Sequence, residues 1–234
     1  MRTLIIPPKV IVEIAKLMNS KIEYGGWLEF DLHGKHSKTK TIKGQQLSVS
    51  VPTEYYELHW HTHPEYLVSS GTIQQTGPFQ PPSRDDIAQS SAKYFDVHFI
   101  GGTLLKQLVF TSQAVYIQEC IPSVLEKFFK TKDFIKKDDK TDIIWTNKWY
   151  TPFKTIVNPI LRQIQNIGLD LGGYIDDDTG KHVPPSESDY IRLYKDSEKL
   201  EKAYFDVCKE FGVKVTKIMD WKGLLKNGMQ IKVN

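Results

Sequence analysis

Apolar residues recur at helical spacing near the start of the chain and again in its second half. The first stretch covers residues 8–19, with Pro8 well placed in a first turn, and it predicts an amphipathic helix. A longer helix is predicted from Ser186, which can act as the N-cap, to Phe211, which precedes the helix-ending Gly212. Helices are also predicted over residues 83–94 and 152–167, with a short one within 123–148.

Other segments alternate apolar and polar residues, which predicts half-buried strands. In the strand predicted over residues 57–63, Leu58 and Trp60 face one way while His59, His61 and His63 face the other. Strands are also predicted over residues 21–31, 47–51, 97–100, 104–110 and 114–119, and the last segment, 213–234, is read as a strand, a turn and a final strand over 229–233. Residues 33–43 and 65–82 are predicted to be loops.

This order of elements predicts an α/β fold for the front of the chain, with the first domain complete at residue 121. Residues 122–148 contain the short helix and a lysine- and aspartate-rich stretch over 130–140, which indicates a charged linker. Residues 149–234 form a mainly helical C-terminal region whose sequence indicates no chemistry.

Composition narrows the class of protein without naming a function. The 234 residues are 40% apolar and 25% charged, as in soluble globular proteins, and no apolar run approaches the roughly 18 residues of a membrane span. Prolines 7 and 8 interrupt the apolar N-terminus, so no signal peptide is expected. With only Cys120 and Cys208, no disulfide framework is expected, which favours a reducing, cytoplasmic location. A net charge of +3 does not indicate nucleic acid as a partner.

Candidate metal ligands lie in the front half, which holds six of the seven histidines. His61 and His63 project from the same side of their strand, and Asp86 at the start of the next helix could supply a third ligand. Three protein ligands and a fourth position held by water are typical of catalytic zinc. The alternative is structural: two hydrogen-bonded histidines on a strand, and an ordinary helix start with Ser83 as N-cap and Asp86 in the first turn.

A carboxylate upstream could complete such a site. Glu23 lies after the first predicted helix and at the entrance to a strand. A zinc hydrolase needs a general base that takes a proton from the attacking water and returns it to the leaving amine. A lone glutamate at such a place is more commonly a solvated loop residue.

The combined pattern resembles the JAMM (MPN+, JAB-domain) metalloproteases over about residues 5–120. Their signature is a glutamate near the first helix, then His-x-His-Pro, then Ser-x-x-Asp. Here the matching stretches are Glu23 with Gly26 and Leu28, then His61-Thr62-His63-Pro64, then Ser83-Arg84-Asp85-Asp86.

The resemblance implies a fold, a cofactor and roles for these residues. The fold would be a mixed central sheet flanked by helices, followed by the helical C-terminal extension. One zinc ion per chain would bind His61, His63 and Asp86. Glu23 would be the general base and acid, and Ser83 would stabilise the oxyanion of the tetrahedral intermediate.

The resemblance also implies an activity, the cleavage of a peptide or isopeptide bond after a ubiquitin-like modifier, as in deubiquitinases. The substrate would be such a protein or its conjugate, and the C-terminal region could bind a protein partner. Two alternatives stay open: an assembly-type scaffold that keeps the ligands without turnover, and a zinc hydrolase acting on a peptide conjugate that contains no modifier.

One departure from the family pattern concerns spacing. Twenty-two residues separate His63 from Asp86, more than is usual in the family. Loop closure costs grow slowly with length, so the site need not be disturbed, and residues 65–82 are either a lid or substrate-contact loop or a passive insertion. Asp85 competes with Asp86 as ligand, although the motif spacing favours Asp86. His59, on the same strand face, either supports the ligands or makes a structural contact on the strand; His98 is read as structural, and Asp176–Gly180 as a turn instead of a calcium loop.

Overall fold

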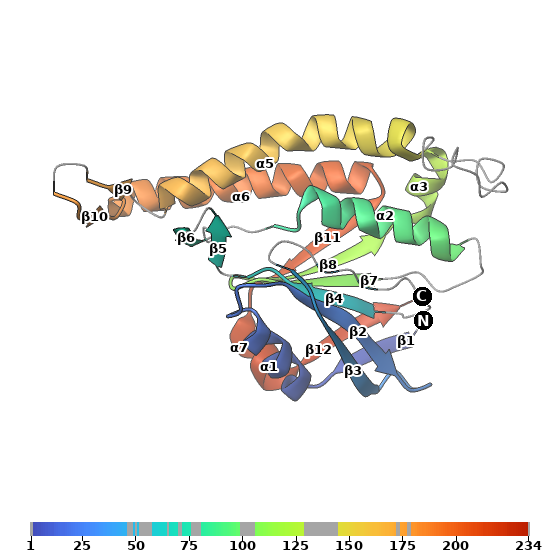
Figure 1. Ribbon diagram of the computed structural model, residues 1–234. Coiled ribbons are helices and arrows are strands. Elements are labelled where there is room, and N and C mark those ends of the chain that lie inside the picture. Colours follow the sequence, from blue (N-terminus) through green and yellow to red (C-terminus); the bar gives the residue numbers. More distant parts are fainter. Residues whose placement is uncertain are drawn as a thin grey trace.

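A six-stranded mixed sheet forms the centre of the protein (Figure 1). The computed structural model describes residues 2–45, 49, 51, 58–64, 66–69, 72–75, 81–98, 106–128, 145–171, 174–176 and 179–233. The strands are β1 (Arg2–Ile6), β2 (Tyr24–Phe30), β3 (His36–Lys43), β4 (Leu58–Thr62), β5 (Tyr66–Ser69), β6 (Thr72–Gln75), β7 (Lys106–Phe110), β8 (Val115–Cys120), β9 (Tyr174–Ile175), β10 (His182–Val183), β11 (Val213–Ile218) and β12 (Met229–Val233). The helices are α1 (Pro8–Leu17), α2 (Arg84–His98), α3 (Pro122–Phe128), the π-helical turn η2 (Thr146–Tyr150), α5 (Thr151–Leu171), α6 (Glu187–Glu210) and α7 (Trp221–Asn227).

The order of strands in the sheet is β11-β8-β7-β4-β2-β3. Strands β4 and β7 run parallel, and every other pair is antiparallel. This arrangement agrees with the mixed α/β fold that the sequence predicts, and it places β4, the strand with the paired histidines, between β2 and β7 in the middle of the sheet.

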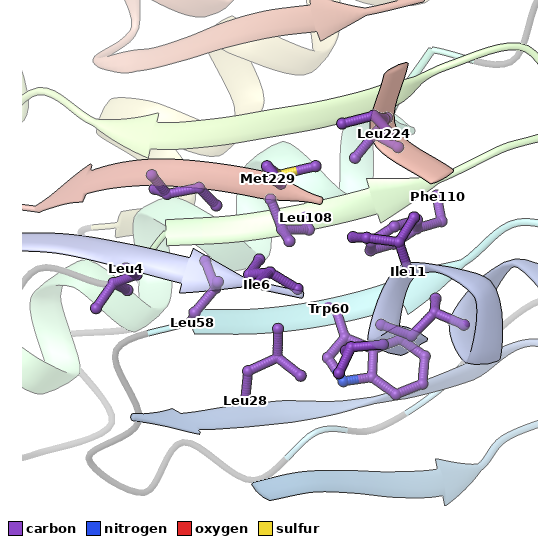
Figure 2. Packing of buried hydrophobic residues seen from close by; sticks show 14 of the residues in the cluster. Leu4, Ile6, Ile11, Leu28, Leu58, Trp60, Leu108, Phe110, Leu224 and Met229 are labelled. Carbon is purple, nitrogen blue, oxygen red and sulfur yellow. The ribbon is translucent and has the colours of Figure 1, made fainter. Parts of the chain in front are cut away.

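The two faces of the sheet have different partners (Figure 1). On one face, Leu58 and Trp60 of β4 are completely buried in a cluster with α1, α7 and the β1–β12 pair. Figure 2 shows Trp60, Leu28 and Leu108 of the sheet pointing toward Ile6 and Ile11 of this layer. Because side chains alternate along a strand, His59 and His61 point to the opposite face, as predicted.

Helices α2, α5 and α6 cover that opposite face (Figure 1). Their core is rich in aromatic side chains, with Trp149, Phe153 and Tyr204 fully buried. Trp149 donates a hydrogen bond from Nε1 to the carbonyl oxygen of Phe211 at 2.8 Å. The long helix α6 begins as predicted, because the Ser186 hydroxyl accepts a hydrogen bond from the backbone N–H of Asp189.

The end of the chain returns to the front half. Strand β11 extends the central sheet next to β8, and β12 pairs with β1 along its whole length. Helix α7 packs against α1, and the two chain ends lie close together (Figure 1). The segment after residue 121 thus completes two layers of the fold, and the domain boundary predicted there stays a prediction.

Several local predictions were wrong. Residues 36–43 form the edge strand β3 instead of a loop, and the predicted loop 65–82 contains the antiparallel pair β5–β6. Val97 and His98 end helix α2 instead of opening a strand, and α7 replaces the predicted turn. Of the strand predicted over residues 47–51, the described positions 49 and 51 are in coil and the rest lies outside the described residues, as does the charged stretch 130–140.

Candidate metal centre

His61 and His63 meet at the C-terminal end of β4. Their Nε2 atoms are 3.2 Å apart, and their rings are tilted by 47° to each other. The backbone N–H of His63 donates to the carbonyl oxygen of Phe110, which continues the parallel pairing of β4 with β7 past the last strand residue. Both rings are therefore placed by the sheet itself.

Asp86 reaches the two imidazoles from the first turn of α2. Its Oδ1 lies 3.1 Å from Nε2 of His61, and its Oδ2 lies 3.2 Å from Nε2 of His63. The same residue forms a reciprocal cap with Ser83: the Ser83 N–H donates to Asp86 Oδ2, and the Asp86 N–H donates to Ser83 Oγ. Asp86 can therefore cap the helix and face the two histidines at the same time, so the structural and the metal-binding interpretations are compatible.

The three side chains could hold a metal ion. Their donor atoms lie within 4.8 Å of one another, and each side chain is at least five-sixths buried. With bonds of about 2.0–2.1 Å and tetrahedral angles, two ligand atoms of one zinc ion lie about 3.3 Å apart. The 3.2 Å between the two histidine Nε2 atoms is close to that edge length, and each imidazole has its own Asp86 oxygen at 3.1–3.2 Å, so the group could hold an ion of this size.

Electrostatics within the group favour a charged carboxylate. Burial opposes ionisation of Asp86, but the charges and hydrogen bonds of His61 and His63 outweigh it and hold the pKa of this carboxyl well below its ordinary value. Burial likewise tends to lower the pKa of His63, whereas the hydrogen bond and charge of Asp86, aided by Glu23, raise it above the ordinary value overall. Asp86 is thus a carboxylate, and its charge favours a positive charge on His63.

Glu23 lies close enough to interact with all three groups. Burial, the largest effect, raises the pKa of its carboxyl; the charges of His63 and His61 lower it, and that of Asp86 raises it again. Thr62, between the two histidines, holds the neighbouring residue in place, because its hydroxyl both accepts from the N–H of Tyr24 and donates to the carbonyl oxygen of Tyr24. The backbone next to Glu23 is therefore fixed beside the site, and the Glu23 side chain is half-buried there.

Two residues that sequence reasoning did not include lie around the group. Gln107 of β7 contacts Nδ1 of His61 at 3.0 Å. Tyr204 of α6 donates to the carbonyl oxygen of Pro82, directly before the Ser83 cap. Gln107 stands next to the apolar run 108–110 of a predicted strand, but no local signal indicates its contact with His61 or the Tyr204 contact 122 residues away in sequence.

The other candidates do not join the group. Asp85 accepts hydrogen bonds from Arg84 and Tyr150 instead of facing the histidines, in agreement with the spacing argument for Asp86. His59 is buried outside the three-residue group. The side chain of His98 lies outside the described residues. Asp176 accepts hydrogen bonds from the backbone N–H and hydroxyl of Thr179, as expected of a turn.

Comparisons with known proteins give no match: no family model, no curated protein and no solved structure is similar to this chain. Among the helices that the structure describes, none combines the length and apolar character of a membrane span. The site must therefore be interpreted from its own geometry.

Proposed function

We propose that this protein is a zinc-dependent metalloprotease that cleaves the peptide or isopeptide bond following a ubiquitin-like modifier. The observation that carries the proposal is the convergence of His61, His63 and Asp86 at 3.1–3.2 Å, with the half-buried Glu23 close enough to interact with them. The order and spacing of these residues resemble the JAMM metalloproteases, and this resemblance supplies the substrate class.

Each side chain would have a distinct role in hydrolysis. A zinc ion, when bound, would lower the pKa of a water molecule towards about 7 and polarise the scissile carbonyl. The Glu23 carboxylate would accept the proton of the attacking water and then deliver it to the nitrogen of the leaving amine. The raised pKa of Glu23 suits this exchange, because a base whose pKa approaches the working pH can both take and return a proton.

Ser83 is suited to stabilising the oxyanion. Its hydroxyl oxygen accepts the Asp86 N–H, but no described residue accepts its hydroxyl proton. Ser83 is exposed, so a substrate carbonyl could approach it from solvent. Donation of this proton to the developing oxyanion would stabilise the transition state of acyl transfer.

Two other functions use the same residues. A scaffold would bind the metal ion and catalyse no hydrolysis, and a hydrolase of another class would cleave short peptide conjugates. The position of Glu23, a half-buried carboxylate that interacts with His61, His63 and Asp86, favours an enzyme over a scaffold, because perturbed carboxyl groups gather at catalytic sites.

The test uses the full-length, zinc-loaded protein and two panels of fluorogenic amides. One panel joins the fluorophore to the C-termini of ubiquitin and ubiquitin-like proteins, and the other to short peptides with the same last residues. We expect turnover of at least one modifier amide, with much slower turnover of its peptide counterpart. Cleavage of peptides alone would identify the other hydrolase, and stoichiometric zinc without any turnover would identify the scaffold.

Matched variants connect the turnover to the site. Asp86→Asn should remove zinc and activity together, whereas Asp85→Asn, at the next position but turned toward Arg84 and Tyr150, should retain both. The reverse pattern would assign the ligand to Asp85.

A further inference from the structure

A chain of buried amide and hydroxyl groups lies behind His61, on the face of the sheet that α2 covers. Gln107 on β7 lies 3.0 Å from Nδ1 of His61 through one end of its carboxamide, and its other end lies 3.0 Å from the hydroxyl of Ser90 on α2. The same Ser90 hydroxyl lies 2.5 Å from the carboxamide of Gln118 on β8. All four side chains are at least nine-tenths buried.

The number of donor hydrogens on Gln107, Ser90 and Gln118 limits how these side chains can be hydrogen-bonded. As placed, the Ser90 hydroxyl faces the amide oxygens of both Gln107 and Gln118, yet it has one proton and can donate to only one of them. The two ends of a carboxamide have the same shape, so the hydrogen-bond network decides which end faces which neighbour. One of the two glutamines must therefore turn its amide around.

Each choice fixes a different tautomer of His61. If Gln118 turns, hydrogen bonds run toward His61, Gln107 donates to Nδ1, and the ring proton must sit on Nε2, between His63 and Asp86. If Gln107 turns, the direction reverses: Nδ1–H of His61 donates to the Gln107 oxygen, Gln107 donates to Ser90, and Ser90 donates to Gln118. Only this second arrangement leaves the Nε2 lone pair of His61 available for a metal ion.

We infer that Gln107 is a positioning residue that accepts Nδ1–H of His61, and that the Gln107–Ser90–Gln118 chain thereby keeps Nε2 of His61 ready to bind metal. The inference rests on the proposed metal site and extends it to the residues that set its affinity. Histidine ligands commonly donate their second ring N–H to a neighbouring acceptor, and loss of that acceptor weakens metal binding by about 10- to 100-fold.

The experiment measures zinc affinity of the full-length protein by competition with a chelator of known affinity. Gln107→Met, which keeps the side-chain volume and removes the acceptor, should weaken binding by about 10- to 100-fold. Gln107→Glu should restore affinity to within a few-fold of wild type, because a carboxylate oxygen can accept Nδ1–H but cannot donate to it. Gln118→Met makes the same change at the hydrogen-bonded side chain farthest from His61, and it should weaken zinc binding clearly less than Gln107→Met.

Three results would contradict the inference: Gln107→Met binding zinc as tightly as wild type, Gln107→Glu losing affinity as much as Gln107→Met, or equal losses in Gln107→Met and Gln118→Met. The last would indicate a general packing effect. If wild-type protein binds no zinc, the proposed function fails instead, so the two failures are distinguishable.

A measurement on wild-type protein covers the case in which the Gln107→Met variant does not fold. Long-range proton–nitrogen correlation spectra of the zinc-loaded, ¹⁵N-histidine-labelled protein report which ring nitrogen carries the proton. We expect His61 to be protonated at Nδ1. A proton on Nε2 of His61, with Nδ1 accepting from Gln107, would overturn the assignment.

Discussion

Two buried polar groups lie on the same face of the central sheet, and the negative charges of their carboxylates are balanced differently. In the first, the Glu201 carboxylate of α6 accepts a hydrogen bond from the Tyr116 hydroxyl at 2.8 Å and pairs with Lys217 Nζ at 2.5 Å. In the second, His61, His63 and Asp86 converge with Glu23 nearby, and the pKa of neither carboxyl is shifted by a described lysine or arginine.

The contrast indicates what each group is for. The chain supplies the positive charge for Glu201 from the strand β11, so this group joins α6 to the sheet and needs nothing else. The chain supplies Asp86 only with imidazoles: His63, whose pKa is raised, can take up a proton in the metal-free protein, and the rings must be neutral to bind metal. A bound metal ion would therefore replace the proton as the counter-charge of Asp86.

The largest effect should follow from removing the two imidazoles. His61→Ala/His63→Ala should lose bound zinc and all hydrolytic activity, because a single carboxylate cannot hold the ion at a buried site. Metal analysis of the purified protein should give about one zinc per chain for wild type and none for the variant. If folded wild-type protein binds no zinc even when zinc is supplied, then both buried groups only stabilise the fold.

The second-largest effect, a loss of turnover, is expected for Glu23→Gln. It removes the proton acceptor and keeps the hydrogen-bonding shape, so turnover should fall by about 10²- to 10⁴-fold. Zinc content should be unchanged, because Glu23 is not among the three ligands. Normal turnover in this variant would show that the proton passes through another group.

Removing the charge of Glu201, whose counter-charge is Lys217, should lower stability and leave metal binding unchanged. Glu201→Gln leaves the Lys217 ammonium without its counter-charge, and both side chains are at least 86% buried. Loss of one partner of such a pair costs about 3 kcal/mol of unfolding free energy, measurable by urea denaturation.

A control for that loss is available on the same helix. Asp196 pairs with Lys199 at the surface of α6, so Asp196→Asn should cost well under about 1 kcal/mol. Zinc affinity should be unchanged in both variants. A loss of zinc in Glu201→Gln would mean that the two groups are coupled.

Stability of the metal-free protein should depend on pH through the second buried group, which contains His63 and Asp86. The pKa of His63 is raised, so its contribution to stability is complete below the ordinary value of 6.5 and is lost as the pH rises through the raised pKa. The pKa of Asp86 is lowered, so its contribution is present above 3.8 and is lost as the pH falls through the lowered pKa.

Bound zinc should reverse the first of these trends, because it takes the place of the proton and binds better as the pH rises. Urea denaturation between about pH 5 and about pH 8.5, with chelator or with zinc, checks both directions. Identical pH profiles for the metal-free and zinc-supplemented protein would contradict a shared site.

Sequence reasoning reached the three residues of the candidate metal site because their signals are local. Strand alternation placed His61 and His63 on one side, and the capping pattern placed Asp86 in the first turn of a helix. The edge strand β3 was missed because its residues are mostly polar and none of them is buried, although Thr39, Thr41 and Ile42 favour strands. Helix α7 was missed although Asp220 caps it by accepting the Gly223 N–H.

Contacts between distant segments could not be predicted in this way. The pairing of β11 with β8 joins residues almost a hundred positions apart, for example Val213 with Cys120. Gln107 meets His61 only because β4 and β7 pair in parallel in one particular register. Nothing in a local pattern specifies that register, so the support behind the ligands appears only in the structure.

The smallest effect should come from the contact between the C-terminal helix and the metal centre. Tyr204 of α6 donates to the carbonyl oxygen of Pro82, which precedes the Ser83–Asp86 cap. Tyr204→Phe should cost about 1 kcal/mol of unfolding free energy. It should also weaken zinc binding slightly, because the turn that carries Asp86 loses one of its fixed points. Tyr190→Phe, on the exposed side of the same helix, should change neither quantity. If Tyr204→Phe lowers stability and leaves zinc affinity at the wild-type value, then the cap alone positions Asp86, and the C-terminal helix supports the fold without acting on the site.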